Sequence, residues 1–144
     1  MIIDKDTGDL VISDDLRLKA GMSFDEVKNS KLRELLDEEN PDEGFHLLFK
    51  PLKVANEEVI ISTFFITERM SIINLYLNVG EEPYANFKLS EAEFQQVIIQ
   101  HQEFLQKILQ TDIIDYQNDF SWGQVELDVD HRERTIMIAI NYIW

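Results

Sequence analysis

The residues best placed to do chemistry are three carboxylates near the C-terminal end of the chain. Glu126, Asp128 and Asp130 alternate with three aliphatic residues. In a β-strand alternate side chains share one face, so this segment predicts a row of carboxylates roughly 6.6–6.8 Å apart, with the aliphatic residues facing the core. That spacing resembles the spacing of phosphates along a nucleic-acid strand. The basic groove of a nuclease could therefore accept the row through bidentate arginine pairs.

The row belongs to a longer acidic stretch. From Ile108 to Asp130 the chain has no lysine or arginine, and we predict that this stretch binds a partner, with Trp122 as an aromatic anchor. The predicted partner-binding residues are Asp112, Asp115, Asp119, Trp122, Glu126, Asp128 and Asp130. A second acidic cluster gives further candidates for partner binding, namely Asp37, Glu38, Glu39, Asp42 and Glu43. Plainer interpretations stay open: the carboxylates form a solvated face that Arg132 and Arg134 partly neutralise, and Trp122 covers an end of the core.

The charge of the whole chain favours binding. Its 144 residues include 28 Asp and Glu against 13 Lys and Arg, which gives a formal net charge of −15. Solubility needs a net charge of only about 2 to 8 in a small domain, and a larger charge destabilises the compact state by self-repulsion. Such a surface repels nucleic acids and anionic membranes, so we expect neither as a partner. It attracts a basic protein.

Other kinds of chemistry find little support. There is no cysteine, and the histidines, His46, His101 and His131, lack the paired spacing of a zinc site, so we expect no metal and no cofactor. We interpret His101 as a hydrogen-bonded residue at the edge of the core. Asp4–Asp9 is interpreted as a hairpin turn, because its residues depart from the pattern of a calcium loop. No nucleophile motif or phosphate-binding loop is present, and nothing singles out a pair of catalytic carboxylates, so we expect a protein that is not an enzyme.

The elements that must position these residues follow from capping residues and apolar patterns. Ser23 with Glu26, and Ser90 with Glu93, have the spacing of capping boxes, which predicts amphipathic helices over residues 24–37 and 90–110. The segments with the pattern of strands are 2–3, 10–12, 45–52, 59–66, 70–79, 122–129 and 135–144. The order ββαβββαββ predicts an α+β fold with a mainly antiparallel sheet of about seven strands.

Length and punctuation indicate one domain over residues 1–144. Only 5 glycines and 3 prolines interrupt the chain, and no linker or repeat is present. The longest apolar stretches are too short to span a bilayer as helices. The N-terminal residues also lack the pattern of a signal peptide. We therefore expect a cytoplasmic protein, or a mature form whose leader was removed.

Two resemblances to known families rest on particular segments. The segment Leu16–Val27 includes Gly-Met-Ser and is similar to the helix entry of small outer-membrane-assembly lipoproteins and of β-lactamase-inhibitor-like domains, although the lipobox cysteine is absent. More of the chain resembles small bacterial immunity-type proteins encoded beside polymorphic or contact-dependent toxins. The similar segments are the Asp-x-x-Thr-Gly-x-Leu hairpin at Asp4–Leu10, the Gly-Met-Ser helix, and the terminal hairpin with Ser121–Glu126 and Ile138–Tyr142.

The resemblance to immunity proteins implies a function in binding. It carries over no catalytic residue, and it implies packing and a tight strand entry for Trp122 and Gly123. The leading hypothesis is an acidic, cytoplasmic, non-enzymatic protein that neutralises a cognate basic toxin domain, for which a nuclease is the favoured class. Two alternatives stay open: a bacterial α+β adaptor or assembly protein without a toxin partner, and a small hydrolase that uses paired carboxylates.

Overall fold

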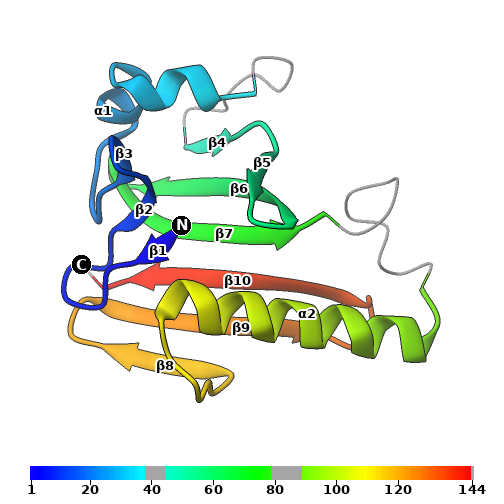
Figure 1. The fold of residues 1–144 in the computed structure, drawn as a ribbon. Coiled ribbons are helices and arrows are strands. Elements are labelled where there is room, and N and C mark those ends of the chain that lie inside the picture. Colours follow the sequence, from blue (N-terminus) through cyan, green and yellow to red (C-terminus); the bar gives the residue numbers. More distant parts are fainter. Residues whose placement is uncertain (38–44, 79–88, 144) are drawn as a thin grey trace.

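Two antiparallel sheets form the framework of the molecule (Figure 1). The computed structural model describes residues 1–37, 45–78 and 89–143. Within these ranges a seven-stranded sheet is accompanied by a three-stranded N-terminal sheet, one long helix and one short helix. The predicted fold class, α+β with a mainly antiparallel sheet and two helices, is confirmed.

The elements follow one another as strands, helices and strands again. In chain order they are β1 (Ile2–Ile3), β2 (Leu10–Ser13), β3 (Leu16–Leu18), α1 (Phe24–Lys28), the 3₁₀ helix η1 (Lys31–Leu35), β4 (His46–Leu48), β5 (Leu52–Val54), β6 (Glu57–Ile66), β7 (Arg69–Leu77), α2 (Glu91–Leu109), β8 (Gln117–Phe120), β9 (Gly123–Asp130) and β10 (Thr135–Tyr142). β3, β5 and β8 were not predicted as separate strands. β8 has the sequence Gln-Asn-Asp-Phe, whose polar residues give no alternation to recognise.

The order of the large sheet brings the C-terminal hairpins against the middle of the chain. Across the sheet the order is β4–β6–β7–β10–β9–β8, and β5 pairs with another part of β6 than β4 does. In the β6–β7 hairpin Phe64 lies opposite Ile72, and a bulge follows between Phe64 and Phe65. The extra residue, Ser71, belongs to β7, so Met70 faces the main core while Ile72 faces the other side of the sheet. The alternation of β6 continues, and Phe65 is buried and meets the ring of Phe24 edge-on, with 5.5 Å between the centroids.

Helix α2 forms where the sequence predicts it. The Ser90 hydroxyl accepts from the Glu93 amide, and the Glu93 carboxylate accepts from the Ser90 amide, so both halves of the capping box are present. Gln110 ends the helix in a left-handed conformation. The apolar side of α2 contacts β10, β9 and β1. Figure 1 shows α2 and the small sheet on the same side of the large sheet. The main core lies between these two elements and the large sheet.

The first helix is much shorter than predicted. The sequence predicted one helix over residues 24–37, whereas the structure has α1 over Phe24–Lys28 and a separate 3₁₀ helix, η1, over Lys31–Leu35. Ser30 accounts for the break, because its hydroxyl donates to the Val27 carbonyl at 2.8 Å and accepts from the Leu32 amide at 3.2 Å. Asp37 is already beyond the helix, and its amide donates to the carbonyl of β4 residue Leu48. The prediction of a continuous helix was therefore wrong.

The N-terminal hairpin is confirmed. Ile2 pairs with Val11 and Ile3 with Leu10, and the Asp4 carboxylate accepts from the backbone amides of the turn, as an Asx-type turn does. These hydrogen bonds hold the pKa of the exposed Asp4 carboxyl below its usual value. No helix in the described ranges is long and apolar enough to cross a lipid bilayer.

Candidate partner-binding site

The predicted carboxylate row of β9 is present. Val125 and Leu127 are buried in the main core, whereas Asp128 and Asp130 are exposed and Glu126 is half-buried. The alternation of β9 therefore directs the acidic side chains away from α2, to the opposite face of the large sheet. We call this face, which is turned away from the viewer in Figure 1, the outer face.

The hairpin of β8 and β9 adds a fourth carboxylate to the outer face. Asp119 lies opposite Gln124, two residues before Glu126 on the neighbouring strand. Glutamine amides orient two of the carboxylates: Gln124 donates to Glu126 at 2.7 Å and Gln117 donates to Asp119 at 3.0 Å. These bonds leave acceptor positions on the carboxylates for a partner. We refer to Asp119, Glu126 and Asp128 as the acidic ladder.

Asp130 serves the turn that follows the strand. Its Oδ1 atom accepts from the amides of Arg132 and Glu133, both at 3.0 Å, which closes the β9–β10 hairpin. The neutralisation by arginine that the sequence left open is not found. Arg134 donates to the Leu89 carbonyl, and among the described residues no ion pair involves the acidic ladder or Asp130.

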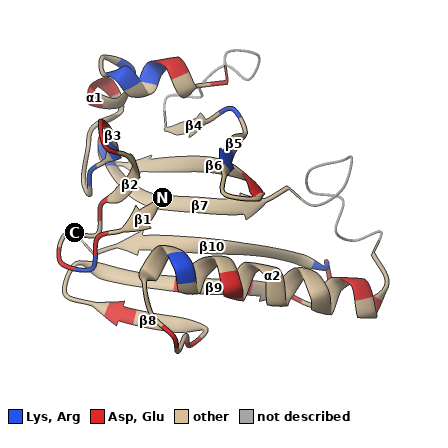
Figure 2. Ribbon diagram, viewed as in Figure 1, with Lys and Arg blue, Asp and Glu red and all other residues tan. Residues whose placement is uncertain are grey.

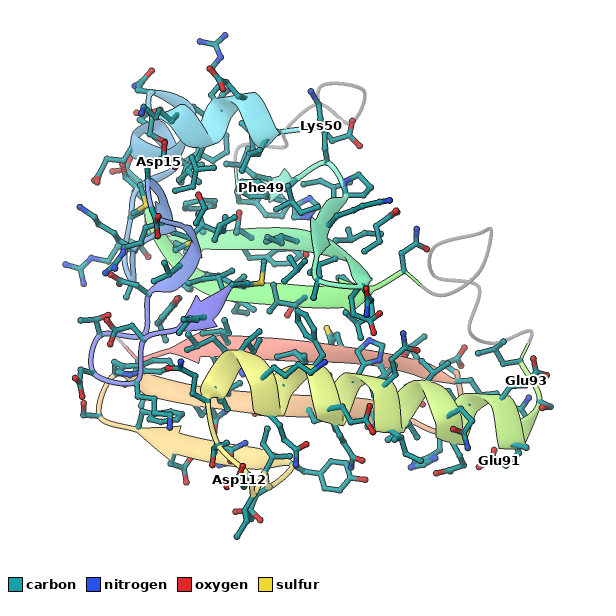
Figure 3. The ribbon with its side chains drawn as sticks, viewed as in Figure 1. Asp15, Phe49, Lys50, Glu91, Glu93 and Asp112 are labelled. Atoms are coloured by element: carbon teal, nitrogen blue, oxygen red, sulfur yellow. The ribbon has the colours of Figure 1, made fainter. Side chains whose placement is uncertain are left out.

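Asp112 and Asp115 lie outside the strands of the large sheet. Both are exposed residues of the connection between α2 and β8, and Figure 3 places Asp112 beside the C-terminal end of α2. The Asn118 side chain holds this connection, because it donates to the Asp115 carbonyl at 2.8 Å and accepts from the Asp115 amide at 3.3 Å. The acidic stretch predicted from sequence therefore divides into two groups of carboxylates, and a role for this pair in binding stays a prediction.

Trp122 makes its described contacts within the molecule. Its ring stacks on Phe120 with 5.0 Å between centroids, and its Nε1–H donates to the Lys5 carbonyl at 2.8 Å. A Cβ atom at Gly8 would lie 2.5 Å from the indole, so the N-terminal turn rests directly on the ring. These contacts match the packing role that the resemblance implied, and partner binding by Trp122 stays a prediction.

The second acidic cluster cannot be placed as a surface. Asp37 is half-buried next to β4, and the other predicted members, Glu38, Glu39, Asp42 and Glu43, lie outside the described residues. Figure 2 shows basic residues (blue) on α1, β3 and β5, whereas β8 and β9 have acidic residues (red) and no basic ones. The charge of the described surface is therefore unevenly distributed.

His101 is a structural residue, as the sequence indicated. It is buried, its Nδ1 lies 2.8 Å from the Val97 carbonyl, and its Nε2 accepts from the Leu77 amide at 3.2 Å. This pair of bonds fixes the neutral tautomer with hydrogen on Nδ1. Burial lowers the pKa of His101, and the Val97 carbonyl and the Glu57 carboxylate oppose that change. Within the described ranges no three His, Asp or Glu side chains are grouped so that they could hold a metal ion.

The sequence did not reveal the apolar part of the outer face. Phe64 of β6, Ile72 and Tyr76 of β7, and Met137 of β10 are half-buried and do not belong to the main core. The prediction for residues 59–66 was a central strand buried on both faces. Its central position is confirmed, and residues 59–63 are all buried, which includes Ile60 and Ser62 on the outer face. Only towards the end of the strand does Phe64 become half-buried on that face. Only the pairing registers reveal that these residues lie beside the acidic ladder, because they come from three separate strands.

Comparison with known proteins shows a likeness in fold. No family model and no curated protein matches the sequence. Among solved structures, the chain is similar to a chain from a complex of a toxin domain with its immunity protein. That complex is described as Rhs1-CT in complex with cognate immunity protein RhsI1. The likeness covers 99% of this chain and 86% of that chain, with a TM-score of 0.57 and 15% sequence identity, which shows a common fold. The resemblance to immunity-type proteins is thus confirmed at the level of the fold.

Proposed function

We propose that this protein is an immunity protein, which binds a cognate toxin domain directly and neutralises it without catalysing a reaction. The observation that supports this most strongly is the likeness in fold, over nearly the whole chain, to a chain of a complex between a toxin domain and its cognate immunity protein. The resemblance of the terminal hairpins and of the Gly-Met-Ser segment to immunity proteins is an independent argument for the same class.

The proposed toxin domain is basic and acts on nucleic acid. The net charge of −15 favours association with a basic partner. In addition, the carboxylates of β9 repeat every second residue, and this spacing could occupy arginines that otherwise hold phosphates. We place the protein in the cytoplasm, where such a toxin would meet its substrate. Because the immunity protein occupies the toxin, protection requires roughly one copy for each toxin molecule.

Co-expression tests this proposal. The toxin domain encoded beside the gene is induced in a sensitive bacterial host, with and without this protein, and survival is measured together with the amount of each protein. We expect survival to rise only when this protein is at least equimolar with the toxin. An unrelated toxin domain is the control, against which no protection is expected.

Two outcomes would contradict the proposal. If the host dies equally with and without this protein, the chain is not an immunity protein for that toxin, and an adaptor function gains support. If amounts far below equimolar protect fully, the protein removes a toxic product by catalysis, which is the behaviour of a hydrolase.

A further inference from the structure

The outer face of the large sheet is left open by the described part of the chain. The helix α2 and the small sheet lie on the other side in Figure 1, and the side chains that form the main core come from that side. Ile60 and Ala139 are buried on the outer face, yet neither belongs to the main core. The chain thus has a second apolar group of residues, separate from the core.

This second group is concentrated on the middle strands. Phe64 and Ile72 lie opposite each other on β6 and β7, and His46 of β4 stacks on Phe64 with 4.6 Å between ring centroids. Tyr76 and Met137 extend the group along β7 and β10. Half-buried aromatic and methionine side chains on an otherwise open sheet are typical of the central part of a protein interface.

The pairing registers join this apolar centre to the acidic ladder. One row across the sheet contains His46, Phe64, Ile72, Asn141, Gln124 and Asp119. The next row contains Leu48, Ser62, Asn74, Ala139, Glu126 and Gln117. In a third position Ile60 pairs with Tyr76, and Met137 pairs with Asp128. In the first row apolar residues on β6 and β7 are followed by polar and acidic residues on β10, β9 and β8. The second row is polar on β6 and β7 and ends at Glu126 and Gln117.

Tyr76 lies where the two parts of the face meet. Burial raises the pKa of its hydroxyl, hydrogen bonds from Ser62 and Asn74 lower it, and the negative charge of Asp128 raises it. Asp128 lies two strands away, because β10 separates β7 from β9 in the sheet. A tyrosine with a half-buried ring and an oriented hydroxyl is a frequent anchor in interfaces.

The size of the face suits a stable complex. The strands of this face have between 3 and 10 residues, and at about 4.8 Å spacing and about 3.3 Å per residue they give an area of roughly 650 Å². That area is about what each partner contributes to an interface of ordinary size. A second copy of this chain would bring its own carboxylates against the same face, and the like charges would repel.

We infer that the outer face of the large sheet is the surface on which the toxin domain docks, with basic toxin residues over the acidic ladder and apolar toxin residues over Phe64, Ile72, Tyr76 and Met137. This inference rests on the proposed immunity function and names the surface that performs it. It differs from the acidic stretch as a whole, because it leaves out Asp112 and Asp115.

Matched variants separate the outer face from the rest of the surface. The ladder variant is Asp119→Asn, Glu126→Gln and Asp128→Asn, and its control removes three exposed charges elsewhere, by Asp14→Asn, Asp25→Asn and Glu103→Gln. The apolar variant is Ile72→Gln with Met137→Gln. Its control is Ile99→Gln with Ile113→Gln, whose native side chains are 43% and 80% exposed. Circular dichroism and thermal unfolding establish that each variant is folded.

The probe is the toxin domain encoded beside the gene, inactivated by a substitution in its own active site, and the dissociation constant is measured for each variant. We expect the ladder variant to bind at least about 30-fold more weakly, which corresponds to about 2 kcal/mol. We expect at least a tenfold loss for the apolar variant, and less than a threefold change for either control.

A second measurement needs no substitution. The chain has four methionines, and ¹³C-methyl labelling gives each a separate signal. On binding, the signal of Met137 should shift or broaden. The signals of Met22, which lies just before α1, and of Met70 in the main core should stay unchanged.

The outcomes distinguish the inference from the function. If the parent chain does not bind the probe, the proposed immunity function is wrong for that toxin, and the inference is wrong with it. If the parent binds but the outer-face variants bind equally well, or only the controls lose affinity, the function stands and the inference is overturned. A dimer of the parent that the outer-face variants abolish would also overturn it.

Discussion

Replacing His101 by leucine should weaken the attachment of α2 to the large sheet. The imidazole accepts from the Leu77 amide of β7 across the helix–sheet boundary, at 3.2 Å, and only 1% of the residue is exposed. Leucine fills a similar volume but has no acceptor. The Leu77 amide therefore becomes a buried donor without a partner.

The expected loss of stability comes from the Leu77 amide alone. A buried donor without a partner costs about 1–3 kcal/mol, whereas the Val97 carbonyl keeps its helical partner and costs little. For a chain of this size the melting temperature should fall by roughly 2–4 °C for each kcal/mol. Binding of the toxin domain below that temperature should stay unchanged, because α2 lies on the side opposite the outer face.

Urea unfolding at neutral pH measures the effect. The control is His131→Leu, because His131 is exposed and its ring meets Phe94 edge-on with 5.9 Å between the centroids. We expect the control to stay within about 0.5 kcal/mol of the parent. If His101→Leu is as stable as the parent, the bond between His101 and the Leu77 amide contributes nothing and the reasoning is refuted.

The pH dependence gives a second test of the same bond. Burial lowers the pKa of His101 in the folded state. As the pH falls, this histidine is therefore protonated in the unfolded chain at a higher pH than in the folded chain. The parent thus loses the contribution of His101 as the pH falls below about 6.5. The stability difference between the parent and His101→Leu should be largest near pH 7 and should narrow toward pH 5. A difference that grows in acid would contradict the assignment of a neutral, buried imidazole.

Substitutions at three further positions test the framework, each by urea unfolding. Gly123→Ala should cost at least about 2 kcal/mol, because a Cβ atom there would lie 2.0 Å from the Asn141 carbonyl oxygen; an unchanged stability would show that the strand entry can move. Ser90→Ala should cost about 1 kcal/mol through the lost helix cap, and Ser90→Thr should recover most of it. Trp122→Phe removes the donor to the Lys5 carbonyl and should cost about 1 kcal/mol, with faster amide exchange in the N-terminal hairpin; slower or equal exchange would contradict the anchoring role.

The long elements could be predicted because local and tertiary signals agree in them. α2 has its capping box and a continuous apolar side, and β6, β7, β9 and β10 have strong strand patterns over 8 to 10 residues. The short elements could not, because two or three pairing partners decide them. β8 becomes a strand only because β9 lies beside it, and Ser30 divides a helix whose apolar spacing runs on without a break.

The candidate site was predictable only in part, for the same reason. The alternation within β9 is a local pattern, so the orientation of Glu126 and Asp128 followed from the sequence. The placement of Asp119 beside them, and of Asp112 away from them, depends on the β8–β9 hairpin. The apolar centre depends on pairing between β6, β7 and β10, which no single segment encodes.

The central claim, that this protein acts by binding a toxin domain, is tested most directly by titration calorimetry. The purified chain is titrated with the inactivated toxin domain encoded beside its gene, at low and at high salt. The account predicts a one-to-one complex with a dissociation constant below about 1 µM. It also predicts that affinity decreases as salt screens the acidic surface. Absence of any complex at concentrations well above that value would contradict the claim. A complex with equal affinity at low and high salt would contradict the role given to the carboxylates.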